Sequence, residues 1–373
     1  MKTPIFHISL ASFSMISLIL LSSFMTSNGS YDTSSSRKSG FVQSEQKESS
    51  LQNLNYFEKR ETDVEYKLTY GWKDYSNKEH IMDFPISKKQ LLKAENEFGY
   101  YPEELRKYLE ERLQGMRGEM ILALKKFTSQ LIAKSKYSQY ILIEEIDAQN
   151  FMFKFSVSRP YSLYKEVKLE FDRIRSLLAA EQKKYTKKID KEQEKLRRDY
   201  FKKRGFRFIG DKVGVNYRRS IINNRPRVKH VMTAMKKKNK KLSLRQFLAL
   251  MLAFIQEIKF EIPPLQENKK FILEFWVPPK VLVYNRGDCD SKGVTFASMW
   301  TNFKRYPIIL IRIPRHLFIG LAIPSFSEEG FTINGLRYTL CEVTGPDKMP
   351  LGMITPYSRF YLQGGQFRYE MIR

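Results

Sequence analysis

The segment Pro278–Trp300, PPKVLVYNRGDCDSKGVTFASMW, combines a turn, an acidic pair around one cysteine and the start of a helical run. Asn285-Arg286-Gly287 predicts the turn, and Asp288 is placed to cap the helix that follows. Cys289 then lies in the first helical turn, where unpaired backbone N–H groups and the helix dipole favour the thiolate. We therefore expect a lowered pKa for Cys289. The flanking Asp288 and Asp290 oppose this charge, so the site requires a positive partner.

His316 is the histidine best placed to be that partner. It is the only one of the four histidines that we expect in the same compact unit as Cys289, and it opens an apolar strand, HLFIGLAI. Glu342 lies on the strand that follows the Asn334-Gly335 hairpin turn. Neighbouring antiparallel strands can bring a histidine and a carboxylate together on one face. Glu342 would then orient His316, which would deprotonate Cys289.

The chain has one other cysteine, Cys341. Because side chains alternate along a strand, Cys341 should point away from Glu342 and serve as a small buried residue. The alternative is a disulfide between Cys289 and Cys341, which would block the proposed chemistry.

These motifs resemble the transglutaminase-like superfamily of papain-like cysteine enzymes, in particular its bacterial branches. The resemblance covers about residues 243–358 and rests on four phrases in the family's order. They are FIQEIKF (254–260), PPKVL (278–282), GDCDS (287–291) and EVTGP (342–346). It implies a nucleophile helix packed on an antiparallel sheet, with Cys289, His316 and Glu342 as the catalytic set. The chain departs from the family at the third position, where Asp is more frequent than Glu.

Further site residues complete this hypothesis. Gly287, Asp288 and Asp290 form the nucleophile turn, and Gln256 is a candidate donor to an oxyanion. The expected reaction is acyl transfer at an amide or peptide bond of a protein or peptide. Water as acceptor gives a peptidase or deamidase, which we favour, and an amine gives a transglutaminase. No metal or other cofactor is expected, because the cysteines and histidines lack ligand spacing.

The charge of the chain is the second prominent feature. The net charge is +25, and residues 181–245 alone carry 24 Lys or Arg against six Asp or Glu. Such a segment attracts an anionic membrane, an envelope polymer or another acidic partner. Interleaved aromatic residues would also suit nucleic acid, which an exported protein rarely meets. The remaining alternatives are a solvated basic helix and a catalytically inactive adaptor that binds through this segment. The oligomeric state is not predicted.

The organisation along the chain predicts an α+β protein with five segments. Residues 1–30, with the apolar run ISLILL (16–21), read as a signal peptide or signal anchor, and 31–54 as a flexible spacer. Residues 55–160 form an α+β module, 161–241 a long basic helix (165–203) and an irregular connector, and 242–373 the transglutaminase-like domain. The protein is therefore expected to be exported: periplasmic, secreted or membrane-anchored.

Overall fold

The computed structural model describes residues 56–147, 150–155, 163–303, 306–324, 330–344 and 348–372. These residues combine helices and sheets, which confirms the α+β class. They form two compact units: one contains Arg106–Arg197, and the other contains the described residues of Ser50–Leu105 and Arg198–Arg373. The expected segments 1–30 and 31–54 lie outside the described residues. Within the described ranges, no helix is long and apolar enough to cross a membrane.

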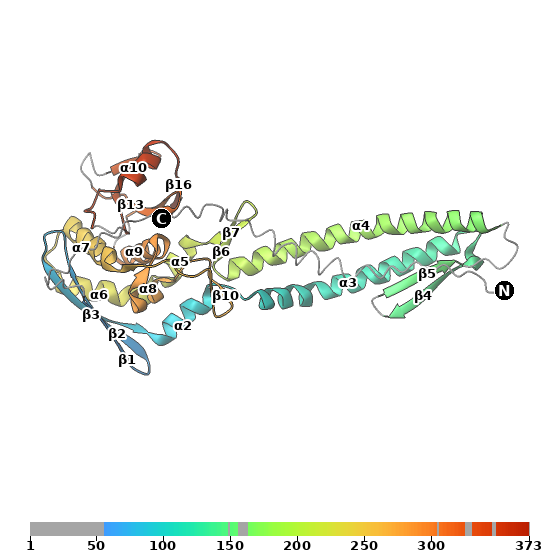
Figure 1. The fold of residues 1–373 in the computed structure, drawn as a ribbon, viewed down its shortest axis with the longest axis horizontal. Helices are drawn as coiled ribbons and strands as arrows, with labels where there is room; N and C mark the ends of the chain where they lie inside the picture. Colours follow the sequence, from blue (N-terminus) through green and yellow to red (C-terminus); the bar gives the residue numbers. More distant parts are fainter. Residues whose placement is uncertain are drawn as a thin grey trace, which may run out of the picture. The chain divides into compact units, whose positions relative to one another are not determined.

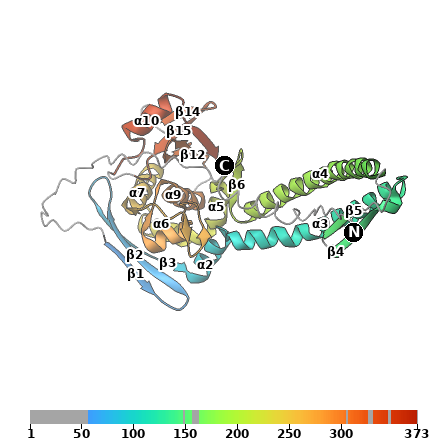
Figure 2. The same ribbon diagram turned by 45° about the vertical axis from the view of Figure 1, so that its right-hand side comes forward.

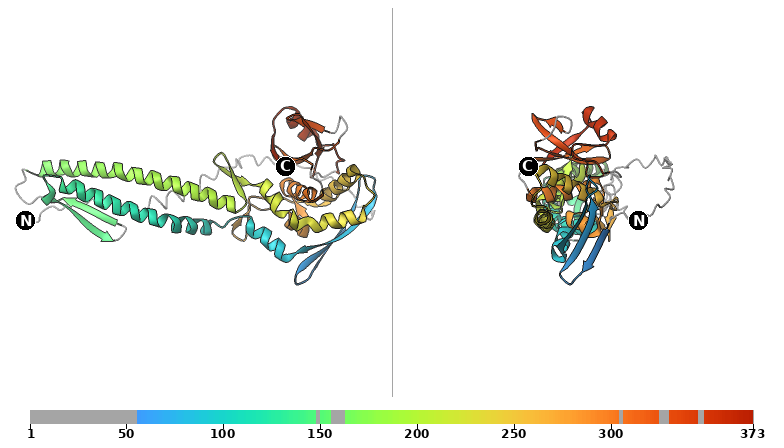
Figure 3. Two further views of the ribbon diagram at one scale, coloured as in Figure 1. Left: turned by 180° about the vertical axis from the view of Figure 1, so that it is seen from behind. Right: turned by 90° about the vertical axis from the view of Figure 1, so that its left-hand side faces the viewer.

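The first unit is a pair of long helices joined by a hairpin. Helices α3 (Pro102–Ala133) and α4 (Tyr164–Lys203) lie side by side (Figure 3). The short helix η1 (Ser138–Tyr140) and the paired strands β4 (Ile141–Asp147) and β5 (Asn150–Phe155) connect them. The apolar stripe of α4, including Phe171 and Leu178, is buried with Leu124 of α3. The long helix is thus confirmed, and its stripe packs within its own unit.

The second unit begins with an antiparallel three-stranded sheet. It contains β1 (Tyr56–Glu61), β2 (Glu65–Lys73) and β3 (Glu79–Ser87), followed by helix α2 (Lys88–Glu97). Tyr70 and Trp72 of β2 pack against Phe254 of helix α7 (Leu244–Glu257), with ring centroids 5.1 and 5.2 Å apart. This aromatic contact joins the sheet to the C-terminal half of the chain. Figure 2 shows the backbone of the sheet running along the helices of that half. Residues 56–105 therefore do not fold with the residues up to 160, in contrast to the module expected from the sequence. The expectation that His316 is the only histidine in the unit of Cys289 is also wrong, because His80 and His230 belong to this unit.

The connector expected to be irregular, 205–241, is folded. It forms the hairpin β6 (Phe206–Ile209) and β7 (Lys212–Val215), helix α5 (Tyr217–Asn224), the short helix η3 (Pro226–Val228) and helix α6 (Lys229–Lys238). Val228, Val231, Met232 and Met235 are all buried. They recur at helical spacing, and the many lysines and arginines between them masked this pattern.

The C-terminal half centres on helix α9 (Cys289–Phe303). The helix packs on a five-stranded sheet on one side and against α5, α6, α7 and α8 (Pro278–Tyr284) on the other (Figure 1). The sheet has the order β14-β15-β13-β12-β16, with every neighbouring pair antiparallel. Its strands are β12 (Ile308–Ile313), β13 (His316–Leu321), β14 (Gly330–Ile333), β15 (Leu336–Cys341) and β16 (Arg368–Met371).

Short elements complete this half. They are the parallel pair β8 (Lys259–Phe260) and β11 (Arg286–Gly287), the antiparallel pair β9 (Gln266–Glu267) and β10 (Lys270–Phe271), and helix α10 (Pro356–Gln363). The Asn334-Gly335 turn between β14 and β15 has positive φ at both residues, 50° and 75°. This is the hairpin geometry that the Asn-Gly pair predicts.

Candidate functional site

The start of α9 is built as the sequence predicts. The Asp288 side chain accepts a hydrogen bond from the Ser291 backbone N–H at 2.9 Å, so it caps the helix. Asn285 ends α8 in the left-handed conformation, with φ of 51°. Gly287 lies in β11, and a Cβ there would be 3.3 Å from Cβ of Ser291. The turn therefore delivers Cys289 to the first position of the helix.

A glycine brings α9 close to the sheet. A Cβ at Gly293 would lie 2.5 Å from Cδ2 of Leu317 in β13, closer than van der Waals contact allows. Gly293 is one helical turn from Cys289 and so projects toward the same side of the helix. This close approach places the Cys289 thiol near β13, where the backbone of Leu317 favours the thiolate and acts to lower the pKa of the thiol.

His316 and Glu342 form the pair expected from the sequence. Nε2 of His316 lies 2.9 Å from both carboxylate oxygens of Glu342. Glu342 follows directly after β15 and is completely buried, and 18% of the His316 side chain is exposed. The backbone N–H and hydroxyl of Thr344 also donate to Oε1 of Glu342, at 3.3 and 3.1 Å. The carboxylate is therefore held on both sides, and it fixes the ring of His316.

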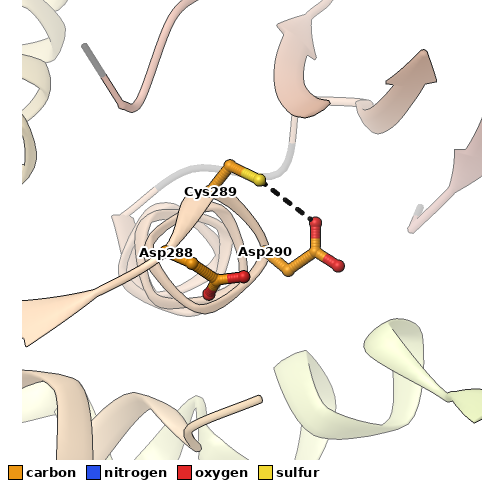
Figure 4. A group of neighbouring side chains, drawn as sticks. All are labelled: Asp288, Cys289 and Asp290. Atoms are coloured by element: carbon orange, nitrogen blue, oxygen red, sulfur yellow. Dashed lines mark hydrogen bonds between the residues drawn. The ribbon is translucent and has the colours of Figure 1, made fainter. Parts of the chain in front are cut away.

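Among the described residues, the hydrogen bond of the Cys289 thiol goes to a carboxylate of its own helix and not to this pair. Its sulfur donates to Oδ1 of Asp290 at 3.6 Å, as Figure 4 shows. In the described part of the chain, Asp290 is its hydrogen-bond partner, and the His316 ring is not. Leu317, the residue after His316, directs its side chain toward Gly293 of α9, whereas the His316 ring stacks on Phe318 of β13 with centroids 6.1 Å apart. Cys289 and His316 therefore both lie near the start of β13, and successive side chains of this strand point to opposite faces.

The electrostatics of Cys289 differ from the expectation. Burial and the carboxylates of Asp290 and Asp288 raise the pKa of the thiol well above its usual range, and the Leu317 N–H lowers it only in part. The expected fall in pKa is wrong for this conformation, because desolvation and two negative charges outweigh the helix terminus. Burial, together with the charge of Asp290, also raises the pKa of Asp288 to about 6. The Cys289 thiolate thus needs a positively charged partner, as the flanking Asp288 and Asp290 indicated in the sequence.

Gln256 does not have the role expected of it. Its Nε2 donates to the backbone carbonyls of Glu342 and Met349, at 2.6 and 2.9 Å. Its Oε1 accepts from the hydroxyl of Tyr75 at 2.9 Å. Both amide hydrogens are used, so the interpretation of Gln256 as an oxyanion donor is wrong. Gln256 instead fixes the backbone at Glu342, together with the loop between β2 and β3.

Two polar residues of the site escaped the sequence analysis. Tyr217 of α5 donates its hydroxyl to Oδ2 of Asp290, so Asp290 bridges this tyrosine and Cys289. Lys292, one turn after Cys289, is completely buried. Its spacing of three residues from Cys289 was the available signal, but a lysine on a helix is usually exposed.

The remaining cysteine behaves as expected. Cys341 is completely buried at the end of β15, and Cys289 and Cys341 are both free thiols, so the alternative of a disulfide does not apply. Burial is the main cause that raises the pKa of Cys341 far above its usual range.

One group of described residues could offer ligand atoms to a metal. Single atoms of Asp288, Cys289 and Asp290 all lie within 4.8 Å of one another. Each carboxylate already accepts hydrogen bonds, from the Ser291 N–H and from Tyr217 and the thiol respectively. The three ligand atoms come from consecutive residues of one turn, and no further observation indicates that they bind a cation.

A comparison of the chain with protein-family models, with curated proteins and with solved structures found no match. The functional argument therefore rests on the geometry of the site.

Proposed function

We propose that this chain is a cysteine-dependent acyl-transfer enzyme that acts on an amide or peptide bond, with Cys289 as nucleophile, His316 as base and Glu342 as the orienting carboxylate. The observation that carries the proposal is the pairing of His316 with a completely buried Glu342, in a unit whose central helix α9 begins with Cys289. A helix that begins with the nucleophile and packs on an antiparallel sheet is also what the transglutaminase-like, papain-type resemblance implies.

The geometry suggests how the proton moves. Nε2 of His316 is occupied by Glu342, so Nδ1 is the atom left to receive the thiol proton. The thiolate attacks the carbonyl carbon, and the carbonyl oxygen becomes an oxyanion. His316 then returns the proton to the leaving amine, and the Cys289 thioester is cleaved by water or by an amine. The backbone N–H of Cys289, at the first helical position, is the candidate oxyanion donor in place of Gln256.

A simple acylation experiment tests this proposal. The full chain is mixed with a p-nitrophenyl ester, and its mass is measured before and after hydroxylamine. We expect one acyl group on Cys289, released by hydroxylamine because a thioester links it, and one equivalent of p-nitrophenolate. Cys289→Ala should give no adduct, and Cys341→Ala should behave as wild type. Equal acylation of wild type and Cys289→Ala would refute the proposal.

A second candidate function is binding of an anionic surface, and the exposed lysines of α4 favour it. Lys183, Lys187, Lys188 and Lys191 are exposed, and Lys184 pairs with Glu181 at 2.7 Å. The basic segment 181–245 is divided between the two units, with residues 181–197 in the first and 198–245 in the second. Binding to vesicles that contain anionic lipid should weaken steeply with added salt, and a flat salt dependence would exclude this function.

A further inference from the structure

Lys292 is the most unusual ionisable group of the described chain. Its whole residue is shielded from solvent, and its ammonium group reaches the C-terminal end of α7. There Nζ donates to the backbone carbonyl of Ile258 at 2.7 Å and to that of Gln256 at 3.4 Å. Two carbonyls at the negative end of a helix dipole suit a cation. They do not explain a buried ammonium, because a buried charge is costly unless it is compensated.

Four acidic groups interact with Lys292, and three of them belong to the proposed site. Glu257 faces it from α7, Glu342 from the segment after β15, and Cys289 and Asp288 from the start of α9. Each of these groups favours the charged form of the lysine. Burial alone acts more strongly and lowers the pKa of Lys292 to about 8, so the ammonium is mostly charged at neutral pH.

We infer that Lys292 is a positioning residue whose buried positive charge stabilises the Cys289 thiolate against the carboxylates that surround it. Cys289, Asp288, Asp290 and Glu342 can all carry negative charge within one small region. His316 supplies one positive charge when it takes the thiol proton, and Lys292 supplies a second that is already present. This inference rests on the proposed function of Cys289 as a nucleophile.

A pair of substitutions separates the charge of Lys292 from its hydrogen bonds. Lys292→Met removes both, and Lys292→Gln removes the charge while its amide can still donate to the carbonyl of Ile258. The readout is the rate of Cys289 alkylation by chloroacetamide between pH 6 and 10, followed by mass spectrometry in the full chain. Thr295→Val is the matched control, because its hydroxyl is also buried on α9 and bonds only to the Ser291 carbonyl at 2.7 Å.

We expect Cys289 to be alkylated about tenfold to a hundredfold more slowly at pH 7 in both lysine variants, because loss of a nearby opposite charge shifts a pKa by about one to two units. Their pH profiles should move to higher pH, and the profile of Thr295→Val should not. A purely structural role predicts that Lys292→Gln keeps the wild-type profile. That result would overturn the inference, as would failure of both lysine variants to fold while Thr295→Val folds.

The same data distinguish this inference from the proposed function. If wild-type Cys289 is as inert as Cys341, the proposed function fails. If alkylation of Cys289 depends on His316 but is unchanged in folded Lys292→Met, only the role of Lys292 is refuted.

Discussion

The substitution Glu342→Gln isolates the role of the buried carboxylate. Both of its oxygens lie 2.9 Å from Nε2 of His316, and the side chain is completely shielded from water. Gln keeps the size of the side chain but removes the charge that stabilises an imidazolium. For charge centres about 4 Å apart, the attraction is about 4 kcal/mol at an effective dielectric constant of about 20. Since about 1.4 kcal/mol corresponds to a factor of ten, we expect acylation to slow about a thousandfold.

The assay is the burst of p-nitrophenolate that accompanies acylation of Cys289. Glu370→Gln is the control, because Glu370 also forms a part-buried ion pair in the same unit, with Arg207 at 2.7 Å. We expect the control to retain the wild-type burst. If folded Glu342→Gln acylates within about threefold of wild type, the electrostatic reasoning is wrong. If Glu370→Gln slows the burst equally, the effect of Glu342 is one of general stability.

Three further changes test the construction of the site. The pKa of Asp288 rises from 3.8 to about 6 on folding, so the native state holds this proton more tightly and loses stability as pH rises from about 4 to 6. Asp288→Asn keeps a capping side chain, so its free energy of unfolding in urea should exceed that of wild type by up to about 3 kcal/mol at pH 7 and by little at pH 4. An equal increase at both pH values would contradict this. Gly293→Ala should lower the free energy of unfolding by about 1 to 3 kcal/mol through its clash with Leu317. Leu317→Ala should then destabilise the Gly293→Ala protein less than it destabilises wild type. Strictly additive effects of the two substitutions would disprove the clash. Tyr75→Phe removes the hydroxyl bonded to Gln256, so it should cost about 1 kcal/mol and slow acylation several-fold; an unchanged burst would show that this brace does not serve Glu342.

Local sequence rules predicted the parts of the site that depend on neighbouring residues. A capping aspartate before Cys289 and an Asn-Gly hairpin before Glu342 are local signals, and both are present. The meeting of His316 with Glu342 followed from strand alternation and from the short connections of the sheet, which leave few registers open.

Long-range packing decided what the sequence did not predict. Gln256 looked free to serve an oxyanion, because nothing in its helix indicated that Tyr75, 181 residues earlier, would dock beside it. The fall in pKa expected for Cys289 ignored burial, which cannot be read from a helix start alone. Lys292 was overlooked because its charge suggested an exposed position, whereas it is completely buried on α9, three residues after Cys289.

The most direct test of the central claim is the pH dependence of alkylation at each cysteine, measured by mass spectrometry in wild type, His316→Ala and His80→Ala. His80 also pairs with a carboxylate, Asp74 at 2.8 Å, and so serves as the matched control. Cys341, which is completely buried, is the internal reference. The proposed dyad predicts that Cys289 is alkylated faster than Cys341 near neutral pH, and that this difference is lost in His316→Ala and retained in His80→Ala. Alkylation of Cys289 that is as slow as that of Cys341, or that is unchanged by His316→Ala, would contradict the account.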